Sequence, residues 1–333
     1  MKISRRTDPN YFKIAIVLLN LYFRQYKLNV IYVIIRLIIK MEILYDFPLY
    51  RPPSEADSMI FQVTLGCSFN KCSFCNMYRT KEYMERPWEE IKTEIDLAAK
   101  AYPNTRRIFL ADGDALNLST DRLTQILKYL KTKFANIERI SCYAMPKNLL
   151  QKKDDELDRL RAAGLGMFYI GVETGNDLLL KKITKGATSK GIIESCRRAK
   201  RCGYILSCMI ILGIGGKSYT HEHTHDTARV INEIIPNYLG ALTLHLEEGI
   251  YNEFMTKFNE PFVPLEDIDI LNELERLISN INVSTPVIFR ANHASNVYSL
   301  GGTFPHDKEK LLSLVLELKN RPEMLKPKVL RRF

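Results

Sequence analysis

From residue 60 onward, short apolar runs alternate with amphipathic stretches along the chain. The apolar runs predict six strands, over residues 60–65, 107–111, 140–143, 167–172, 206–212 and 241–246. The stretches between them predict helices. One begins at Pro87, and the others cover residues 121–133, 154–163, 190–200 and 223–234. Because parallel neighbours need crossover connections, this alternation predicts an α/β fold in which a parallel sheet curls into a partial (β/α)6 barrel.

The rhythm changes after residue 247, where a loop-rich stretch leads to a predicted helix over residues 265–281. A short strand over 286–290 and a last helix over 308–319 follow. We therefore divide the chain into a core over residues 41–250 and a C-terminal α/β extension over 251–333, packed on that core.

Residues 1–40 are unlike the remaining chain. They hold eight bases and one acid, and therefore carry +7 of the net charge of +10. Their two apolar runs, 14–23 and 28–35, are shorter than the roughly 20 residues that a membrane-spanning helix needs, so we expect no transmembrane segment. We interpret residues 1–40 as a mis-assigned start that precedes Met41; the alternative is a basic amphipathic anchor at a membrane surface.

The charge that remains, +3 outside residues 1–40, leaves the body of the protein nearly neutral. A phosphate-binding groove would require a basic face, so we do not expect nucleic acid as a partner.

Three of the seven cysteines lie close together, and the other four are dispersed through predicted core segments: Cys142, Cys196, Cys202 and Cys208. A secreted disulfide framework would be denser in a shorter chain, so we expect a reducing, cytoplasmic location.

The clustered cysteines are Cys67, Cys72 and Cys75, directly after the first predicted strand. Reactive groups gather in the loops that follow the carboxyl ends of parallel strands. A structural zinc site needs four ligands, and no fourth cysteine is near. An iron–sulfur cubane can instead use three cysteines and leave one iron open, which suits a cofactor with an amine and a carboxylate.

At these residues the sequence resembles the radical S-adenosylmethionine (SAM) superfamily, distantly including proteins of the oxygen-independent coproporphyrinogen oxidase type. The family usually spaces its cysteines by three residues and then two, whereas this chain has four and then two. The resemblance covers roughly residues 60–250 and implies a [4Fe–4S] cluster and SAM as cofactors. It also implies that Phe74 lies near the adenine of SAM.

Three further motifs follow later strands in the order that the family has them. The Gly113–Asp114 turn matches the family's contact with the SAM amino group; the alternative is a solvated turn. Glu173 follows an apolar run and matches the contact with SAM ribose and methionine; a structural salt bridge is the alternative. Gly213 and Gly215 resemble the glycine-rich turn beside the adenine.

The resemblance further implies an oxidoreductase or transferase that cleaves SAM reductively, with a flavodoxin- or ferredoxin-type electron donor. We expect a small-molecule substrate, with Arg290 as an anion clamp and His293 as a proton donor; a loop that only supports the barrel is the alternative. An enzyme that modifies RNA or peptide, and a non-catalytic iron–sulfur or zinc protein, remain open. We interpret His221, His223 and His225 as a solvated helix start.

Overall fold

The computed structural model describes residues 45–331, and the predictions for residues 1–40 lie outside them. Eight strands form one sheet in the order β1-β4-β5-β6-β7-β8-β9-β10, and β2 pairs with β3. Every pairing in the large sheet is parallel except that of β9 with β10. The strands are β1 (Met59–Gln62), β2 (Thr64–Leu65), β3 (Met84–Glu85), β4 (Arg107–Ala111), β5 (Arg139–Tyr143), β6 (Leu165–Glu173), β7 (Ile205–Leu212), β8 (Tyr238–Thr243), β9 (Val287–Ala291) and β10 (Leu300–Phe304).

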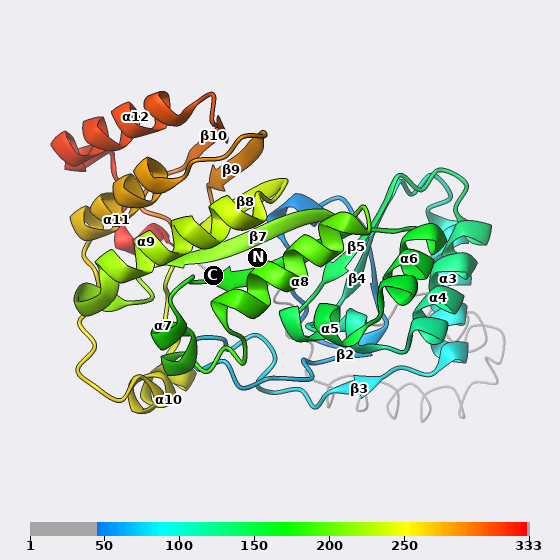
Figure 1. The fold of residues 1–333 in the computed structure, drawn as a ribbon. Coiled ribbons are helices and arrows are strands. Elements are labelled where there is room, and N and C mark those ends of the chain that lie inside the picture. Colours follow the sequence, from blue (N-terminus) through cyan, green and yellow to red (C-terminus); the bar gives the residue numbers. More distant parts are fainter. Residues whose placement is uncertain (1–44, 332–333) are drawn as a thin grey trace, which may run out of the picture.

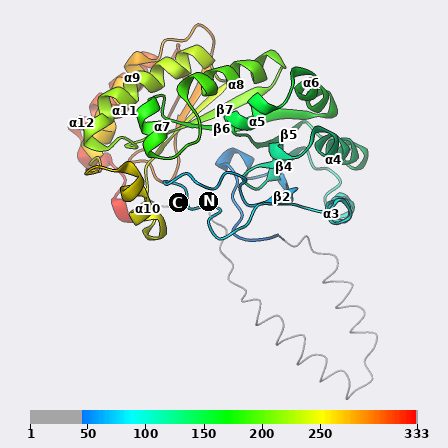
Figure 2. The ribbon, with the colours of Figure 1, turned by 60° about the horizontal axis from the view of Figure 1, so that its bottom comes forward.

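Helices cover the outer side of the curved sheet, where α3, α4, α6, α8, α9 and α11 follow one another in an arc (Figure 2). Two further helices, α7 and α10, lie together near the carboxyl ends of the strands (Figure 1), where Lys182 Nζ donates to the carbonyl of Phe258. The helices are α3 (Trp88–Ala101), α4 (Thr120–Lys133), α5 (Pro146–Gln151), α6 (Asp154–Ala163), α7 (Asp177–Lys182), α8 (Ser189–Arg201), α9 (Gly216–Ile234), α10 (Glu248–Phe258), α11 (Asp267–Asn280) and α12 (Lys308–Asn320).

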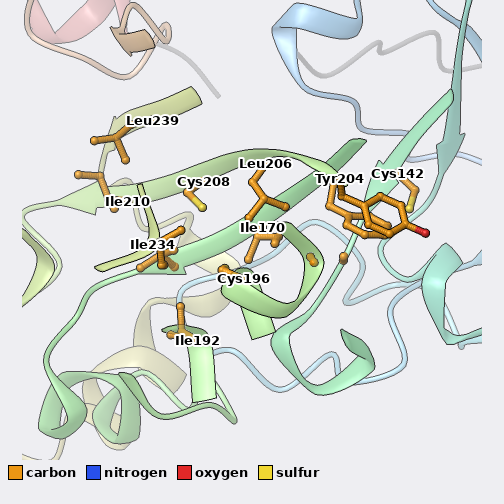
Figure 3. Close-up of a cluster of buried hydrophobic side chains, with 14 of the residues drawn as sticks. Cys142, Ile170, Ile192, Cys196, Tyr204, Leu206, Cys208, Ile210, Ile234 and Leu239 are labelled. Atoms are coloured by element: carbon orange, nitrogen blue, oxygen red, sulfur yellow. The ribbon is translucent and has the colours of Figure 1, made fainter. Parts of the chain in front are cut away.

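The register of the sheet distinguishes a buried outer row of side chains from a more exposed inner row. One outer row pairs Ile170, Cys208, Leu239 and Phe289 on four neighbouring strands, and each of these side chains is buried. Figure 3 shows Ile170 and Cys208 near the helix residue Cys196, and Leu239 beside Ile210. Alternation along a strand places the next residue of each strand on the opposite face.

The matching inner row pairs Gly171, Met209, Gly240 and Arg290. None of these four residues is buried, and Arg290 is exposed. The inner face of β7, β8 and β9 therefore stays accessible at the level of Gly171, close to the carboxyl ends of the strands.

The amino ends of the strands are closed on the inner face by the segment that precedes β1. Glu55 is fully buried there and accepts hydrogen bonds from Tyr169 Oη at 2.6 Å, Ser141 Oγ at 2.8 Å and Arg139 Nη2 at 2.9 Å. Polar groups from β5 and β6 satisfy the buried carboxylate, as a buried charge requires. The open part of the barrel is the opposite, carboxyl end.

The predicted α/β architecture, a partial barrel of parallel strands, is confirmed. The sixth predicted strand is displaced: residues 241–246 were expected, and β8 is Tyr238–Thr243. The apolar run continues beyond β8 because Leu244 and Leu246 pack against the cluster around Phe254. The extension adds the predicted strand near 286–290 as β9, together with β10, which the sequence pattern did not predict.

No helix within residues 45–331 is long and apolar enough to cross a membrane.

Candidate functional site: the cysteine loop and the strand ends around it

The three cysteines lie in the loop between β2 and β3, which we call the cysteine loop (residues 66–79). All three are half-buried. The amide of Cys75 donates to the carbonyl of Cys72 at 3.1 Å, and Ser73 N donates to Ile183 O at 3.0 Å, which ties the loop to the end of α7. Burial, opposed by the ammonium group of Lys185 and reinforced by Cys75, Glu173 and Cys67, raises the pKa of the Cys72 thiol to about 12.

Asp112, directly after β4, holds the start of the cysteine loop. Its fully buried carboxylate accepts hydrogen bonds from Gly66 N at 2.9 Å, Gln62 Nε2 at 3.1 Å and Lys81 Nζ at 2.9 Å. Burial raises the pKa of Asp112, and its hydrogen bond and ion pair with Lys81 oppose that rise. Asp112 is therefore an anchor between β1, β4 and the loop.

Asp114 presents a free oxygen beside the first cysteine. Its Oδ2 accepts a hydrogen bond from Ser68 Oγ, but its Oδ1 is buried without a partner among the described residues. Burial raises the pKa of Asp114. Because Asp112 and Asp114 are both fully buried, the alternative of a solvated turn is wrong. A buried carboxylate oxygen that lacks a donor is suited to receive one from a ligand.

The turn at Gly113 allows the strand end to come close to the cysteine loop. A Cβ atom on Gly113 would lie 2.8 Å from Cys67 Cβ and 2.9 Å from Tyr78 Cε2. Contacts of that length are closer than van der Waals packing permits, so Gly113 is the residue that brings Asp114 next to Cys67.

Glu173 ends β6 with a positive φ of 61° and forms an ion pair with Lys185, 2.7 Å from Oε1 to Nζ. The side chains are 10% and 11% exposed. Burial lowers the pKa of Lys185, but the carboxylate of Glu173 and the thiol of Cys72 outweigh it and raise that pKa to about 12. The salt bridge that was the alternative interpretation of Glu173 is thus present, and the pair lies beside the cysteine loop, with Lys185 Nζ 6.0 Å from the ring centroid of Phe74.

The glycine-rich turn after β7 is held from the C-terminal extension. Gly213 N donates to Glu273 Oε2 of α11, and Thr220 Oγ1 donates to Glu273 Oε1 at 2.9 Å. Glu273 is fully buried, and burial raises its pKa to about 7. Gly215 is the N-cap of α9. Phe74 packs against the hydrophobic cluster that contains Ile214, so the turn and the cysteine loop are neighbours.

Arg290 and His293 lie apart from this group, on and after β9. Arg290 Nη1 donates to Phe289 O at 2.7 Å and to Gly302 O at 3.2 Å. His293 Nδ1 and Ser295 Oγ are 2.9 Å apart, and burial lowers the pKa of His293 to about 4.

The loop that follows His293 also supports the barrel. Asn296 Nδ2 donates to Ala241 O at 2.8 Å, and Thr243 N donates to Ser295 Oγ at 3.2 Å. These bonds satisfy backbone groups at the end of β8, which is the role that the alternative interpretation gave to this loop.

The sequence analysis missed three charged residues that hold the groups of the site through direct contacts: Arg79, Lys185 and Glu273. It was wrong about His223, which is fully buried in α9 with Nδ1 2.8 Å from Thr174 Oγ1, whereas His221 and His225 are exposed. The helix begins earlier than predicted, at Gly216, so His223 falls on its inward face. For Arg79 the sequence did contain one signal, a basic residue four positions after Cys75.

The donor set fits an iron–sulfur cluster with one open iron and a bound SAM molecule. Three thiols from one loop supply cysteine ligands, and Asp114 Oδ1 is a buried acceptor without a partner, as an ammonium group requires. Among the described residues, no three Cys, His, Asp or Glu side chains converge as they would around a single metal ion.

Relatives with known descriptions share this part of the chain. The heme chaperone HemW of Bacillus subtilis is 27% identical over 164 residues, which are 49% of this chain and 42% of HemW. A tRNA-2-methylthio-N(6)-dimethylallyladenosine synthase of Alkalilimnicola ehrlichii is 25% identical over 198 residues, 55% of this chain and 42% of that protein. The chain spans about half the length of the curated relatives it matches.

Among solved structures, coproporphyrinogen III oxidase (HemN) from Escherichia coli, a radical SAM enzyme, has a similar fold. Its TM-score is 0.52 at 18% sequence identity, over 67% of this chain and 52% of HemN. The family model described as the radical SAM superfamily matches residues 61–230, more than half of the chain and the part that carries the cysteine loop, Asp114, Glu173 and the glycine-rich turn after β7. The chain belongs to the radical SAM superfamily, and its cofactors are a [4Fe–4S] cluster and SAM.

Proposed function

We propose that this protein is an enzyme that cleaves SAM reductively and removes a hydrogen atom from a small-molecule substrate. Cys67, Cys72 and Cys75 are the proposed cluster ligands. The observation that carries the proposal is that two strand ends meet the cysteine loop: Ser68 donates to Asp114, and Lys185, paired with Glu173, lies 6.0 Å from the ring of Phe74.

Each residue has a defined task in this proposal. Cys67, Cys72 and Cys75 bind iron as thiolates, which requires that metal binding displace their protons. Asp114 Oδ1 accepts the ammonium group of SAM, and Glu173, fixed by Lys185, faces the remainder of the molecule. When bound, the cluster supplies the electron that splits SAM into methionine and a 5′-deoxyadenosyl radical.

The substrate lies, in our proposal, on the accessible inner face of β7, β8 and β9. Arg290 is exposed on that face, and its Nε and Nη2 have no hydrogen bond among the described residues, which suits a carboxylate or phosphate. His293 lies in the same segment; because its pKa of about 4 leaves it neutral near pH 7, we propose that it contacts the substrate as a neutral imidazole and not as the predicted proton donor. A flavodoxin- or ferredoxin-type protein is the proposed electron donor.

The relatives suggest two alternative functions, because one is described as a tRNA-2-methylthio-N(6)-dimethylallyladenosine synthase and others as heme chaperones. The near-neutral body of the chain favours a small molecule over RNA. A chaperone would hold its cargo without consuming SAM, so SAM turnover separates it from an enzyme.

The test is anaerobic reconstitution of the full chain with iron and sulfide, followed by dithionite and SAM and measurement of 5′-deoxyadenosine. We expect 5′-deoxyadenosine from the wild-type chain and none from Cys72→Ala. Cys202→Ala, a half-buried cysteine outside the site, is the matched control and should behave as wild type. If the protein forms a complete cluster but neither binds nor cleaves SAM, the proposal is refuted and a non-catalytic iron–sulfur protein is favoured.

A further inference from the structure

The cysteine loop has one residue more between its first two cysteines than the usual spacing of the family, and Asn70 lies within that longer interval. Asn70 adopts a positive φ of 41°, a conformation that asparagine tolerates better than most residues. Its side chain donates from Nδ2 to Tyr78 O at 2.8 Å, so the interval between the first two cysteines is joined to the far end of the loop. The longer loop is thus folded back on itself at Asn70.

Arg79 fastens the same loop through its backbone carbonyls. Its Nη1 donates to Asn70 O at 2.9 Å, its Nη2 to Cys72 O at 2.8 Å and its Nε to Cys75 O at 3.1 Å. One planar guanidinium therefore fixes the carbonyls of two of the three cysteines and of the residue in the left-handed conformation. A lysine ammonium has no such fixed fork of donors, so it cannot replace this geometry.

Arg79 also connects the loop to α10. Its Nη2 lies 3.1 Å from Glu253 Oε1, and the two side chains are 23% and 38% exposed. An ion pair this exposed contributes little stability by itself. The three carbonyl contacts, rather than the ion pair, are therefore the main effect of Arg79.

We propose that Arg79 is a positioning residue that holds the longer cysteine loop in the shape that binds the cluster. The inference rests on the proposed function for the identity of that cluster. Without the fork, Cys72 and Cys75 lose the common support of their carbonyls, and the ordering of the loop must then be achieved when iron binds. The cluster should consequently form less completely and be lost more readily.

The experiment compares Arg79→Gln and Arg79→Lys with Lys71→Gln and Glu253→Gln in the full chain. Lys71 is exposed in the same loop, and its substitution removes the same charge without touching a carbonyl. Glu253→Gln weakens the connection to α10 and leaves the carbonyl contacts in place. The readouts are iron and sulfide per chain, the electron paramagnetic resonance spectrum of the reduced cluster, the rate of iron release to a chelator, and circular dichroism of the iron-free protein.

We expect Arg79→Gln to release iron roughly 10-fold faster than wild type, the size of effect usual for residues that support metal ligands. Arg79→Lys should be nearly as fast because it keeps the charge and loses the fork, and both control variants should match wild type. Wild-type behaviour of both Arg79 variants, or equal losses in Lys71→Gln or Glu253→Gln, would overturn the proposal. So would failure of both Arg79 variants to fold without iron, because the role would then be general stability.

These readouts do not depend on SAM cleavage. A wild-type chain that holds a cluster and makes no 5′-deoxyadenosine would refute the proposed function alone, and the comparison of the Arg79 variants would still decide this inference. A wild-type chain that forms no cluster would overturn both.

Discussion

Gly171 provides the space in which the ion pair of Glu173 and Lys185 lies. A Cβ atom at this position would lie 1.9 Å from Glu173 Oε1 and 2.8 Å from Lys185 Nζ. In Gly171→Ala the carboxylate must therefore move away from the ammonium group. Gly166→Ala is the matched control on the same strand, because its Cβ would have Ile140 O as its nearest atom, at an ordinary 3.8 Å.

The magnitude follows from the two ways in which the protein can respond. Inserting a methyl group into packed surroundings costs about 1–3 kcal/mol, and breaking a buried ion pair costs about 3–5 kcal/mol. Because Glu173 and Lys185 are each about 10% exposed, we expect the free energy of unfolding to fall by an amount that overlaps both ranges, about 2–4 kcal/mol. For a chain of 333 residues that lowers the melting temperature by roughly 3–6 °C.

The assay is thermal and urea unfolding of the iron-free protein, with Gly166→Ala beside it. Combining Gly171→Ala with Glu173→Ala removes the group that the methyl displaces, so the added cost of Gly171→Ala in that background should fall below about 1 kcal/mol. The reasoning is refuted if Gly171→Ala unfolds like Gly166→Ala, or if its cost is undiminished when Glu173 is alanine.

Two further predictions concern the other carboxylates of the site. Asp114→Asn removes the charge of the proposed ammonium acceptor and should weaken SAM binding to the reconstituted protein by roughly 10-fold or more, measured by equilibrium dialysis, with iron content unchanged; a loss of iron instead would assign Asp114 to the cluster. Burial raises the pKa of Glu273 from 4.5 to about 7, so the folded state binds the proton more tightly than the unfolded state. The free energy of unfolding should then fall as pH rises from 4.5 to 7, by at most about 3 kcal/mol, and stay level above that. Glu273→Gln should lack this slope in urea titrations between pH 5 and 8, and the same slope in the variant would contradict the assignment.

The strands that form the core were predictable because their sequence and their surroundings agree. The run at residues 107–111 is found unchanged as β4, since its apolar side chains all face packed neighbours. The strand β10 was not predictable: Gly301 and Gly302 lower its strand propensity, and it forms because it pairs with β9. The pairing of two strands depends on the tertiary structure, so the local sequence pattern does not predict it.

The site shows the same division. Cys67, Cys72 and Cys75 were predicted from their clustering after the first apolar run, and Asp114 and Glu173 from their places at the ends of later apolar runs. The groups that hold them come from distant segments, as Glu273 does for Gly213 across sixty residues. Such hydrogen bonds depend on how α11 packs against the sheet, so they cannot be predicted from the spacing of residues in the sequence.

The inner row from Gly171 to Arg290 also sets a length. Its four residues occupy paired positions on neighbouring strands, β6 to β9, and strands lie about 4.8 Å apart. Measured along the sheet, Arg290 is therefore roughly 14 Å from Gly171. Under the proposed function, a substrate whose anionic group is bound by Arg290 and whose reacting carbon lies near Glu173 would have to bridge whatever part of this distance the long side chain of Arg290 does not span.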